Sequence, residues 1–105
     1  MNDPIVGGFL NRCKPLTEKV RSVYVFGSRA RGTARPDSDY DVLLVVTDAF
    51  SLDDKDILYD AVMDILLETG RLVSLKIFKE KTFQQLCEMQ TPFTAHVLRE
   101  GIRIG

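Results

Sequence analysis

Two runs of apolar side chains in the first half of the chain predict neighbouring strands. Residues 22–26 consist of Ser22 followed by four β-branched or aromatic side chains and are closed by Gly27, a pattern typical of a short buried strand. Residues 39–46 begin with polar side chains and end in five consecutive apolar ones. A continuous apolar run of this length predicts burial on both faces, as in the middle of a sheet that is covered by helices.

Alternation predicts a third strand over residues 72–78. Its apolar face is formed by Val73, Leu75 and Ile77, and its polar face by Ser74 and Lys76. Residues 102–104 are expected to add a short strand at an edge of the sheet.

Helical spacing and capping residues account for most of the remaining chain. Residues 3–13 are expected to form a helix with Pro4 in its first turn and a kink or end at Pro15. Ser51 is a predicted N-cap, with Asp54 as its capping-box partner, for an amphipathic helix that ends near Gly70. Its predicted core positions are Ile57, Leu58, Ala61, Val62, Ile65 and Leu66.

Two shorter helices are predicted near the C-terminal end. Thr82 is expected to cap the first, which continues through Phe83, Leu86 and Met89. Thr91 and Pro92 are expected to begin the second, which ends at Gly101. The chain is therefore expected to contain both strands and helices.

Length and charge narrow the class of protein. A chain of 105 residues with 45% apolar side chains is expected to form a single domain spanning residues 1–105. With 14 basic and 15 acidic residues, the net charge of −1 argues against nucleic acid as the main ligand. No apolar run is long enough to cross a membrane, and Cys13 and Cys87 lack metal-ligand spacing. We therefore expect a cytoplasmic protein without membrane association and with reduced thiols.

Charge is concentrated around the turn between the first two strands. Four arginines lie within residues 20–35, where there is no acidic residue, and three aspartates follow within residues 37–41. A basic loop beside an acidic strand end suits a polyphosphate and its metal ion better than it suits DNA. Each of these features is common alone, and only their combination indicates a functional site.

Asp39 and Asp41 are the candidate metal ligands. Alternate residues of a strand point the same way and lie about 7 Å apart, so the two carboxylates are expected to project together, with Tyr40 on the opposite face. Adjacent carboxylates repel each other unless a cation lies near them. Mg²⁺ typically binds one or two carboxylates together with phosphate oxygens. The pair therefore predicts a magnesium site.

Gly27, Ser28 and Arg29 are the candidate phosphate ligands. Gly27 permits a sharp turn and leaves its amide accessible, and Ser28 adds a hydroxyl group. Residues 28–31 are expected to form a turn or a short helix whose free amides point at an anion, followed by a loop over residues 32–38. Arg29 is expected to offset phosphate charge, whereas Arg31 is either a further phosphate ligand or a structural residue.

These residues together resemble a known signature. Gly27-Ser28-x-Ala30-Arg31-Gly32 followed by Ser38-Asp39-x-Asp41 is similar to the motif of the minimal nucleotidyltransferases, a branch of the DNA polymerase beta-like superfamily. The resemblance implies an α+β fold, with a small mixed β-sheet that has helices packed on one face and a nucleotide cleft on the other. It implies Mg²⁺, with two ions possible, at Asp39 and Asp41, and ATP or another nucleoside triphosphate at Gly27 and Ser28.

The resemblance also implies a reaction and a partner. In that family an acceptor hydroxyl attacks the α-phosphate and pyrophosphate is released. Small members often pair with a helical HEPN protein, and in such toxin–antitoxin pairs the transferase can adenylylate a tyrosine of its partner. We therefore expect transfer of AMP from ATP to a hydroxyl acceptor such as a HEPN tyrosine. A homo-oligomer is also compatible with the sequence.

One departure from the family pattern bears on catalysis. The family usually supplies a third carboxylate from the next strand, but the matching face here carries Ser74 and Lys76. Loss of a positioned base typically costs about 10²–10⁴ in rate. Lys76 is a candidate phosphate ligand instead. A replacement base could come from a partner or from Asp37, Asp48 or Glu80.

The departure leaves two functions open. The first is a magnesium-dependent nucleotidyltransferase in which Asp39 and Asp41 are catalytic. The second is a catalytically weak or inactive, antitoxin-like module that has kept nucleotide binding. Nucleic-acid binding without chemistry is the weakest reading, because no aromatic residues interleave with the arginines.

Overall fold

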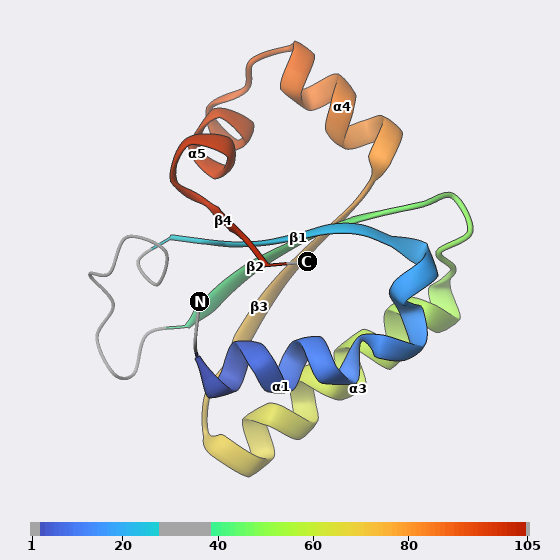
Figure 1. Ribbon diagram of the computed structural model, residues 1–105, viewed down its shortest axis with the longest axis vertical. Helices are drawn as coiled ribbons and strands as arrows, with labels where there is room; N and C mark the ends of the chain where they lie inside the picture. The colour runs from blue at the N-terminus through green and yellow to red at the C-terminus, as the bar shows by residue number, and fades with distance from the viewer. Residues whose placement is uncertain (1–2, 28–38, 105) are drawn as a thin grey trace.

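A single four-stranded sheet organises the chain (Figure 1). The structure is a computed structural model and describes residues 3–27 and 39–104. Its elements are α1 (Pro4–Arg12), η1 (Lys14–Lys19), β1 (Val20–Phe26), β2 (Tyr40–Val46), α3 (Leu52–Thr69), β3 (Val73–Lys79), α4 (Glu80–Glu88), α5 (Pro92–Glu100) and β4 (Ile102–Arg103).

The sheet is mixed, with strand order β3-β2-β1-β4. β1 is antiparallel to both β2 and β4, whereas β2 and β3 are parallel and are connected through α3. The predicted α+β class, the mixed sheet and the edge strand after Gly101 are confirmed. β2 lies between β1 and β3, which explains why its apolar run is continuous: all five residues from Val42 to Val46 are buried.

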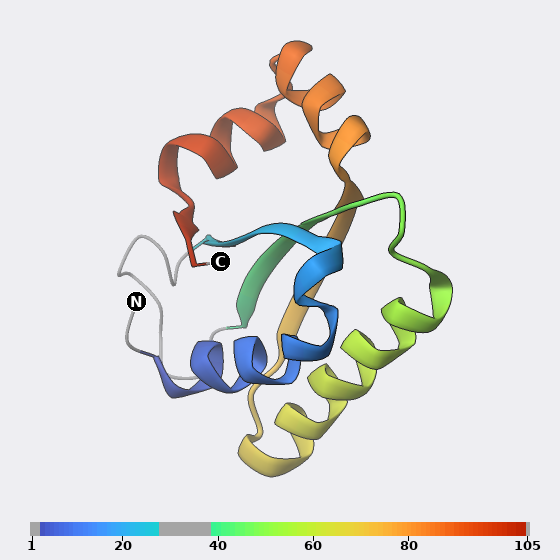
Figure 2. The ribbon, with the colours of Figure 1, turned by 45° about the vertical axis from the view of Figure 1, so that its right-hand side comes forward.

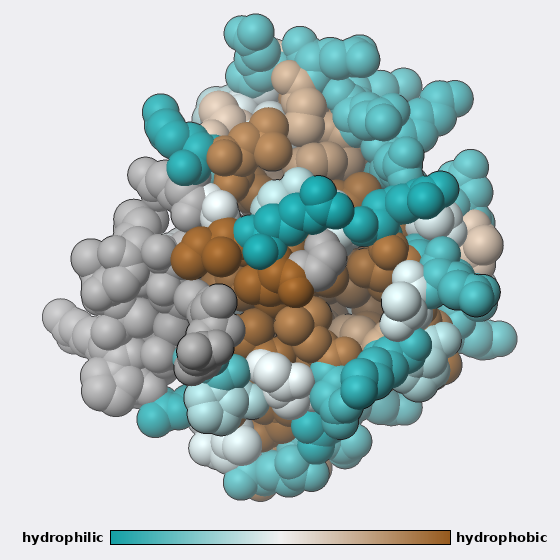
Figure 3. Space-filling view, in the orientation of Figure 1, coloured by the Kyte–Doolittle hydropathy of each residue, from teal (hydrophilic) through white to brown (hydrophobic). Residues whose placement is uncertain are grey.

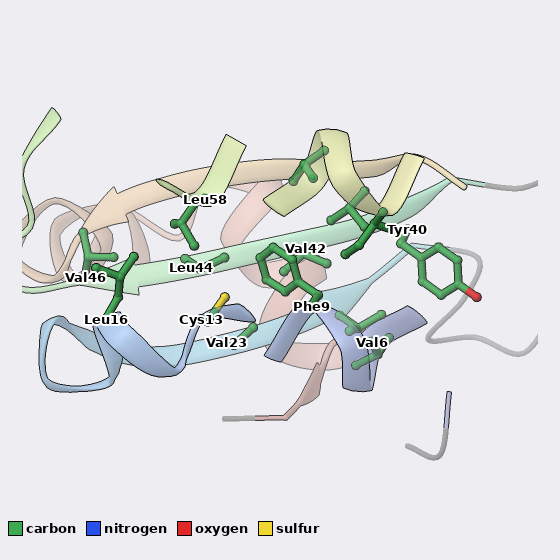
Figure 4. Close-up of a cluster of buried hydrophobic side chains, with 14 of the residues drawn as sticks. Val6, Phe9, Cys13, Leu16, Val23, Tyr40, Val42, Leu44, Val46 and Leu58 are labelled. Carbon is green, nitrogen blue, oxygen red and sulfur yellow. The ribbon is translucent and has the colours of Figure 1, made fainter. Parts of the chain in front are cut away.

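One face of the sheet is covered by α1, η1 and α3. Figure 4 shows Phe9 of α1 and Leu58 of α3 packed against Val42 and Leu44 of β2. Cys13 lies in the same core, where burial raises the pKa of its thiol to about 11. Both Cys13 and Cys87 are free thiols. The predicted helix layer on one face is therefore present.

Helices α4 and α5 pack on part of the opposite face. Phe26, Leu43 and Val45 of the sheet contact Phe83 of α4 and Val97 of α5 there. In the space-filling view, hydrophobic side chains gather at the centre of the molecule, between α1 and α5, with hydrophilic ones around them (Figure 3). Among the described residues, none of the helices combines the length and apolar character needed to cross a lipid bilayer.

The caps of α3 are those predicted. The Ser51 hydroxyl accepts from the Asp54 N–H, the Asp54 carboxylate accepts from the Ser51 N–H, and Gly70 ends the helix in the left-handed conformation. Thr91 caps α5 through the N–H of Thr94, also as predicted. These caps could be predicted because each depends on residues at most four positions apart.

The first helix ends at Arg12, as predicted to within one residue, and the 3₁₀ helix η1, which was not predicted, follows from Lys14. Two local predictions were wrong. α4 begins at Glu80, with Lys79 rather than Thr82 as its N-cap, because the chain passes directly from β3 into the helix. Ile57, a predicted core residue, is 43% exposed. It lies on the side of α3 that faces Arg12 and not on the side that packs against the sheet. The turn predicted for residues 28–31 and the loop predicted for residues 32–38 lie outside the described residues.

Candidate functional site

Asp41 lies at one end of the central strand, between its two neighbours. Its Cα partner is Phe26 in β1 on one side and Ser74 in β3 on the other. The Asp41 side chain is half-buried, and Asp39, which directly precedes β2, is exposed. Asp41 belongs to the same face as Leu43, which packs toward α4 and α5. The α1–α3 layer therefore does not cover this carboxylate.

Gly27 lies directly beside the carboxylate of Asp41. Gly27 has a φ of +74°, in the left-handed region that favours glycine. A Cβ atom at Gly27 would overlap Oδ2 of Asp41 and lie 3.4 Å from its Cγ. No other amino acid fits there without a shift of the carboxylate. The structure thus brings together the glycine turn and one of the two aspartates that the sequence selected.

Tyr40 fixes the start of β2 from the other face of the sheet. Its ring is 4% exposed in the α1–α3 core, and Figure 4 shows its hydroxyl group pointing out of that cluster. The hydroxyl donates a 2.7 Å hydrogen bond to Asp3, the N-cap of α1. The prediction that Tyr40 points away from the aspartate face is confirmed, whereas its bond to Asp3 was not foreseen.

The face of β3 beside Asp41 carries no carboxylate. Ser74 is in register with Asp41, and Lys76 is in register with Leu43. Neighbouring strands lie about 4.8 Å apart and residues two positions apart about 7 Å. Ser74 is therefore the immediate neighbour of Asp41, and the exposed Lys76 lies one step further along the same face.

The two carboxylates suit a metal ion that takes most of its ligands from phosphate oxygens and water. Within the described parts of the chain, no group of three or more His, Cys, Asp or Glu side chains could hold a metal ion. Asp41 supplies a carboxylate beside Gly27, and Asp39, two residues earlier in the chain, supplies a second that is exposed. Mg²⁺ commonly uses one or two carboxylates and completes its shell with phosphate oxygens and water. The residues present therefore fit a magnesium ion bound together with a polyphosphate.

Two of the acidic residues considered as a replacement catalytic base lie far from Asp41. Asp48 lies beyond the opposite end of β2, whose last residue, Val46, is about 17 Å from Asp41 by the rise per residue. Glu80 follows the matching end of β3 and pairs with Arg21 at 2.8 Å. Asp48 and Glu80 therefore do not lie beside Asp41. Ser28 and Arg29, predicted to bind phosphate, lie outside the described residues, as does Asp37.

Comparison with protein families gives one match that spans most of the chain. The family model described as "Polymerase beta, Nucleotidyltransferase" matches residues 11–104. No curated protein matches the sequence. The family match covers both the aspartate pair and all four strands.

Two solved structures share the fold. One is a toxin–antitoxin complex with AMP-PNP; it has a TM-score of 0.57 and 15% identity, over 92% of this chain and 69% of that chain. The other is a mutant of the toxin–antitoxin pair MntA–HpeT in which two aspartates are replaced by glutamate; it has a TM-score of 0.55 and 13% identity, with the same coverage. At these identities the similarity establishes the architecture alone.

Proposed function

The chain belongs to the polymerase beta nucleotidyltransferase family, and on that basis we propose that it is a magnesium-dependent nucleotidyltransferase that moves AMP from ATP to a hydroxyl acceptor. The proposed reaction forms a bond between the acceptor oxygen and the α-phosphorus. The bond from that phosphorus to the bridging oxygen breaks, pyrophosphate leaves, and the hydroxyl proton passes to water or a base. The proposed domain spans residues 1–105.

The observation that carries the proposal is the close approach of Gly27 and Asp41. A polyphosphate needs an accessible backbone turn, and its metal ion needs a carboxylate, within a few ångströms of each other. A Cβ atom at Gly27 would overlap the Asp41 carboxylate, so the backbone turn and this carboxylate lie side by side. A solvated strand end, the alternative explanation of the aspartates, does not require a glycine against the carboxylate.

Each candidate residue has a specific proposed role. Asp39 and Asp41 would hold the ion, and Gly27, Ser28 and Arg29 would orient the triphosphate. A bound Mg²⁺ would neutralise phosphate charge and orient the α-phosphate for attack. Lys76, exposed on the face that carries Asp41, would hold a further phosphate oxygen.

We propose a helical HEPN-type protein as the partner and a tyrosine on it as the acceptor. Both structural neighbours are toxin–antitoxin complexes, and one was solved with the ATP analogue AMP-PNP. They support a protein partner and an adenine nucleotide for a chain of this fold. The acceptor itself rests on the resemblance of residues 27–41 to the minimal nucleotidyltransferases.

A second candidate function is an antitoxin-like module that binds nucleotide but transfers it slowly or not at all. It is favoured by the register of β3, which places Ser74 rather than a carboxylate beside Asp41. Binding requires charge neutralisation and positioning, which the turn and the aspartates could provide. Transfer also requires a group to accept the hydroxyl proton.

The deciding experiment follows label from α-phosphate-labelled ATP in Mg²⁺, with and without the product of the adjacent gene. Label on that partner protein, lost in Asp41→Asn and retained in Glu18→Gln, would establish a protein adenylyltransferase. Glu18 is an exposed acidic residue of η1, away from both the proposed nucleotide site and α3, and serves as the control for the loss of one negative charge. Magnesium-dependent ATP binding without label transfer would favour the second function. Absence of both would refute the proposed nucleotide site.

A further inference from the structure

The outward side of α3 carries an apolar stripe. α3 buries one side against the sheet, and Figure 2 shows that it runs along the outer edge of the molecule. Its other side is expected to be polar. Instead, Leu52 is 80% exposed, Tyr59 42%, Met63 49% and Leu67 79%. Intervals of seven, four and four residues place these side chains in one line along the helix.

An acidic row runs beside the apolar stripe. Asp53, Asp56, Asp60, Asp64 and Glu68 follow at three- and four-residue intervals and are all exposed. Glu68 pairs with Arg12 at 2.8 Å. No ion pair involves the other four within residues 3–27 and 39–104. Arg12 also lines a surface hollow with Asp60 and Asp64, so the row combines five acidic side chains with one nearby arginine and keeps a net negative charge along one edge of the stripe.

A cavity lies at the N-terminal end of the stripe, on the side away from the acidic row. It has a volume of about 430 Å³, and Leu52 belongs both to its lining and to the stripe. The rest of the lining consists of Val46, Phe50, Ser51, Lys55, Ile77 and Lys79. The ammonium group of Lys79 is hydrogen-bonded within the protein, because its Nζ donates to the backbone carbonyls of Thr47 and Phe50. The cavity thus offers mainly apolar wall, which suits an inserted apolar or aromatic side chain.

We propose that this surface docks an amphipathic helix of a partner protein, one with arginine or lysine along one edge of its apolar face. The apolar face would cover the stripe, one large side chain would enter the cavity, and the basic edge would face Asp56, Asp60 and Asp64. The unbalanced charge of the acidic row is what selects a basic partner. The same charge disfavours an anionic lipid surface, which would be repelled.

This inference assigns a surface to the protein partner, and so it rests on that part of the proposed function. It does not rest on the nucleotide chemistry. Asp41→Asn is expected to bind the helix normally, and a double variant of the stripe, Met63→Ser with Leu67→Ser, is expected to bind ATP normally. Failure of one proposal is therefore distinguishable from failure of the other.

The test uses three synthetic helical peptides of about 18 residues, or about 27 Å, matched to the length of α3. The first has leucines at helical spacing and arginines along one edge, the second replaces the arginines by glutamates, and the third replaces the leucines by serines. Fluorescence anisotropy gives the affinities, and amide chemical-shift changes locate the bound peptide. Only the first peptide is expected to bind, with shifts along α3.

Two pairs of variants separate the contributions. Met63→Ser with Leu67→Ser is expected to weaken binding of the first peptide at least about tenfold. The control pair Met89→Ser with Leu98→Ser, exposed at the end of α4 and on α5, is expected to leave it unchanged. Asp60→Lys with Asp64→Lys is expected to weaken the first peptide and to allow the glutamate peptide to bind. Three results would overturn the proposal: chemical-shift changes away from α3, equal peptide binding by the Met63 and Leu67 variant and by the control pair, or a native dimer that only the Met63 and Leu67 variant dissociates.

Discussion

The hydroxyl group of Tyr40 donates a 2.7 Å hydrogen bond to Oδ2 of Asp3, while Oδ1 of Asp3 accepts the backbone N–H groups of Ile5 at 2.8 Å and Val6 at 3.4 Å. One carboxylate therefore caps α1 and holds the first residue of β2. Tyr40 lies between Asp39 and Asp41 in the sequence. The start of the strand that carries the candidate site is thus tied to the helix layer on the opposite face.

Removal of the Tyr40 hydroxyl group tests this connection. Tyr40→Phe keeps the buried ring and is expected to lower the free energy of unfolding by about 1 kcal/mol. Asp3→Ala loses both the cap and the bond, so it is expected to cost about 1–2 kcal/mol. Because the two substitutions remove one shared interaction, their combined cost in urea unfolding should be smaller than the sum of the single costs. Strict additivity would show that the two groups are not coupled.

Gly27→Ala tests the contact between the turn and Asp41, and Gly70→Ala is its matched control. Both glycines have a φ above +70°, but a Cβ at Gly70 would have no atom within 4 Å. Gly70→Ala is therefore expected to cost only the backbone penalty, about 1 kcal/mol. Gly27→Ala should cost more and should also weaken binding of Mg²⁺–ATP, because the carboxylate must shift. If Gly27→Ala and Gly70→Ala lowered the free energy of unfolding equally, and Gly27→Ala left the affinity for Mg²⁺–ATP unchanged, the contact between Gly27 and Asp41 would be contradicted.

The capping box of α3 predicts a pH dependence of stability. The N–H of Ser51 donates to Oδ2 of Asp54 at 2.9 Å, and Nζ of Lys19 lies 2.9 Å from the same oxygen. The Ser51 hydrogen bond, followed by Lys19, lowers the pKa of Asp54. Ser51→Ala removes the reciprocal bond and is expected to cost about 1 kcal/mol.

The sign of this pH dependence follows from the depressed pKa in the folded state. Asp54 contributes fully to stability above its unfolded-state pKa of about 3.9. The contribution is lost as the pH falls through the lower folded-state pKa. Asp54→Asn should therefore flatten the acid limb of a plot of unfolding free energy against pH, while Asp53→Asn, its exposed neighbour, should not. An unchanged acid limb in Asp54→Asn would contradict the assigned cause.

A carboxylate at position 74 tests whether a base is what limits transfer. Ser74 is in register with Asp41, whereas Lys76 lies beside Leu43. Ser74→Asp is therefore expected to raise label transfer to the partner, by about 10-fold or more if it acts as a base. Lys76→Asp should raise transfer less and should weaken ATP binding. No gain from either variant, with binding retained by Ser74→Asp, would support the antitoxin-like function.

Local features of the fold could be predicted from the sequence because their causes lie within a few residues. The α3 caps at Ser51 and Gly70 and the buried run of β2 are of this kind. The start of α4 was misplaced because Thr82 is a good N-cap in isolation, but the continuation of β3 into Glu80 decides where the helix begins.

Relationships across the sheet could not be predicted in the same way. The contact between Gly27 and Asp41 requires the register of β1 against β2, and the bond between Asp3 and Tyr40 joins residues 37 positions apart. The apolar stripe of α3 was also hidden, because the helix has hydrophobic residues on both sides. The sequence shows their number and spacing, and only the packing shows which of them the sheet covers.

Magnesium-dependent ATP binding by wild-type protein, Asp39→Ala and Asp41→Ala is the most direct test of the central claim. Isothermal titration calorimetry with and without Mg²⁺ gives the metal-dependent part of the affinity, and Asp60→Asn controls for the loss of an exposed negative charge. We predict that Mg²⁺ strengthens ATP binding to the wild-type protein and to Asp60→Asn, and that both alanine variants lose this effect. Retention of the magnesium-dependent affinity in both alanine variants would contradict the assignment of Asp39 and Asp41.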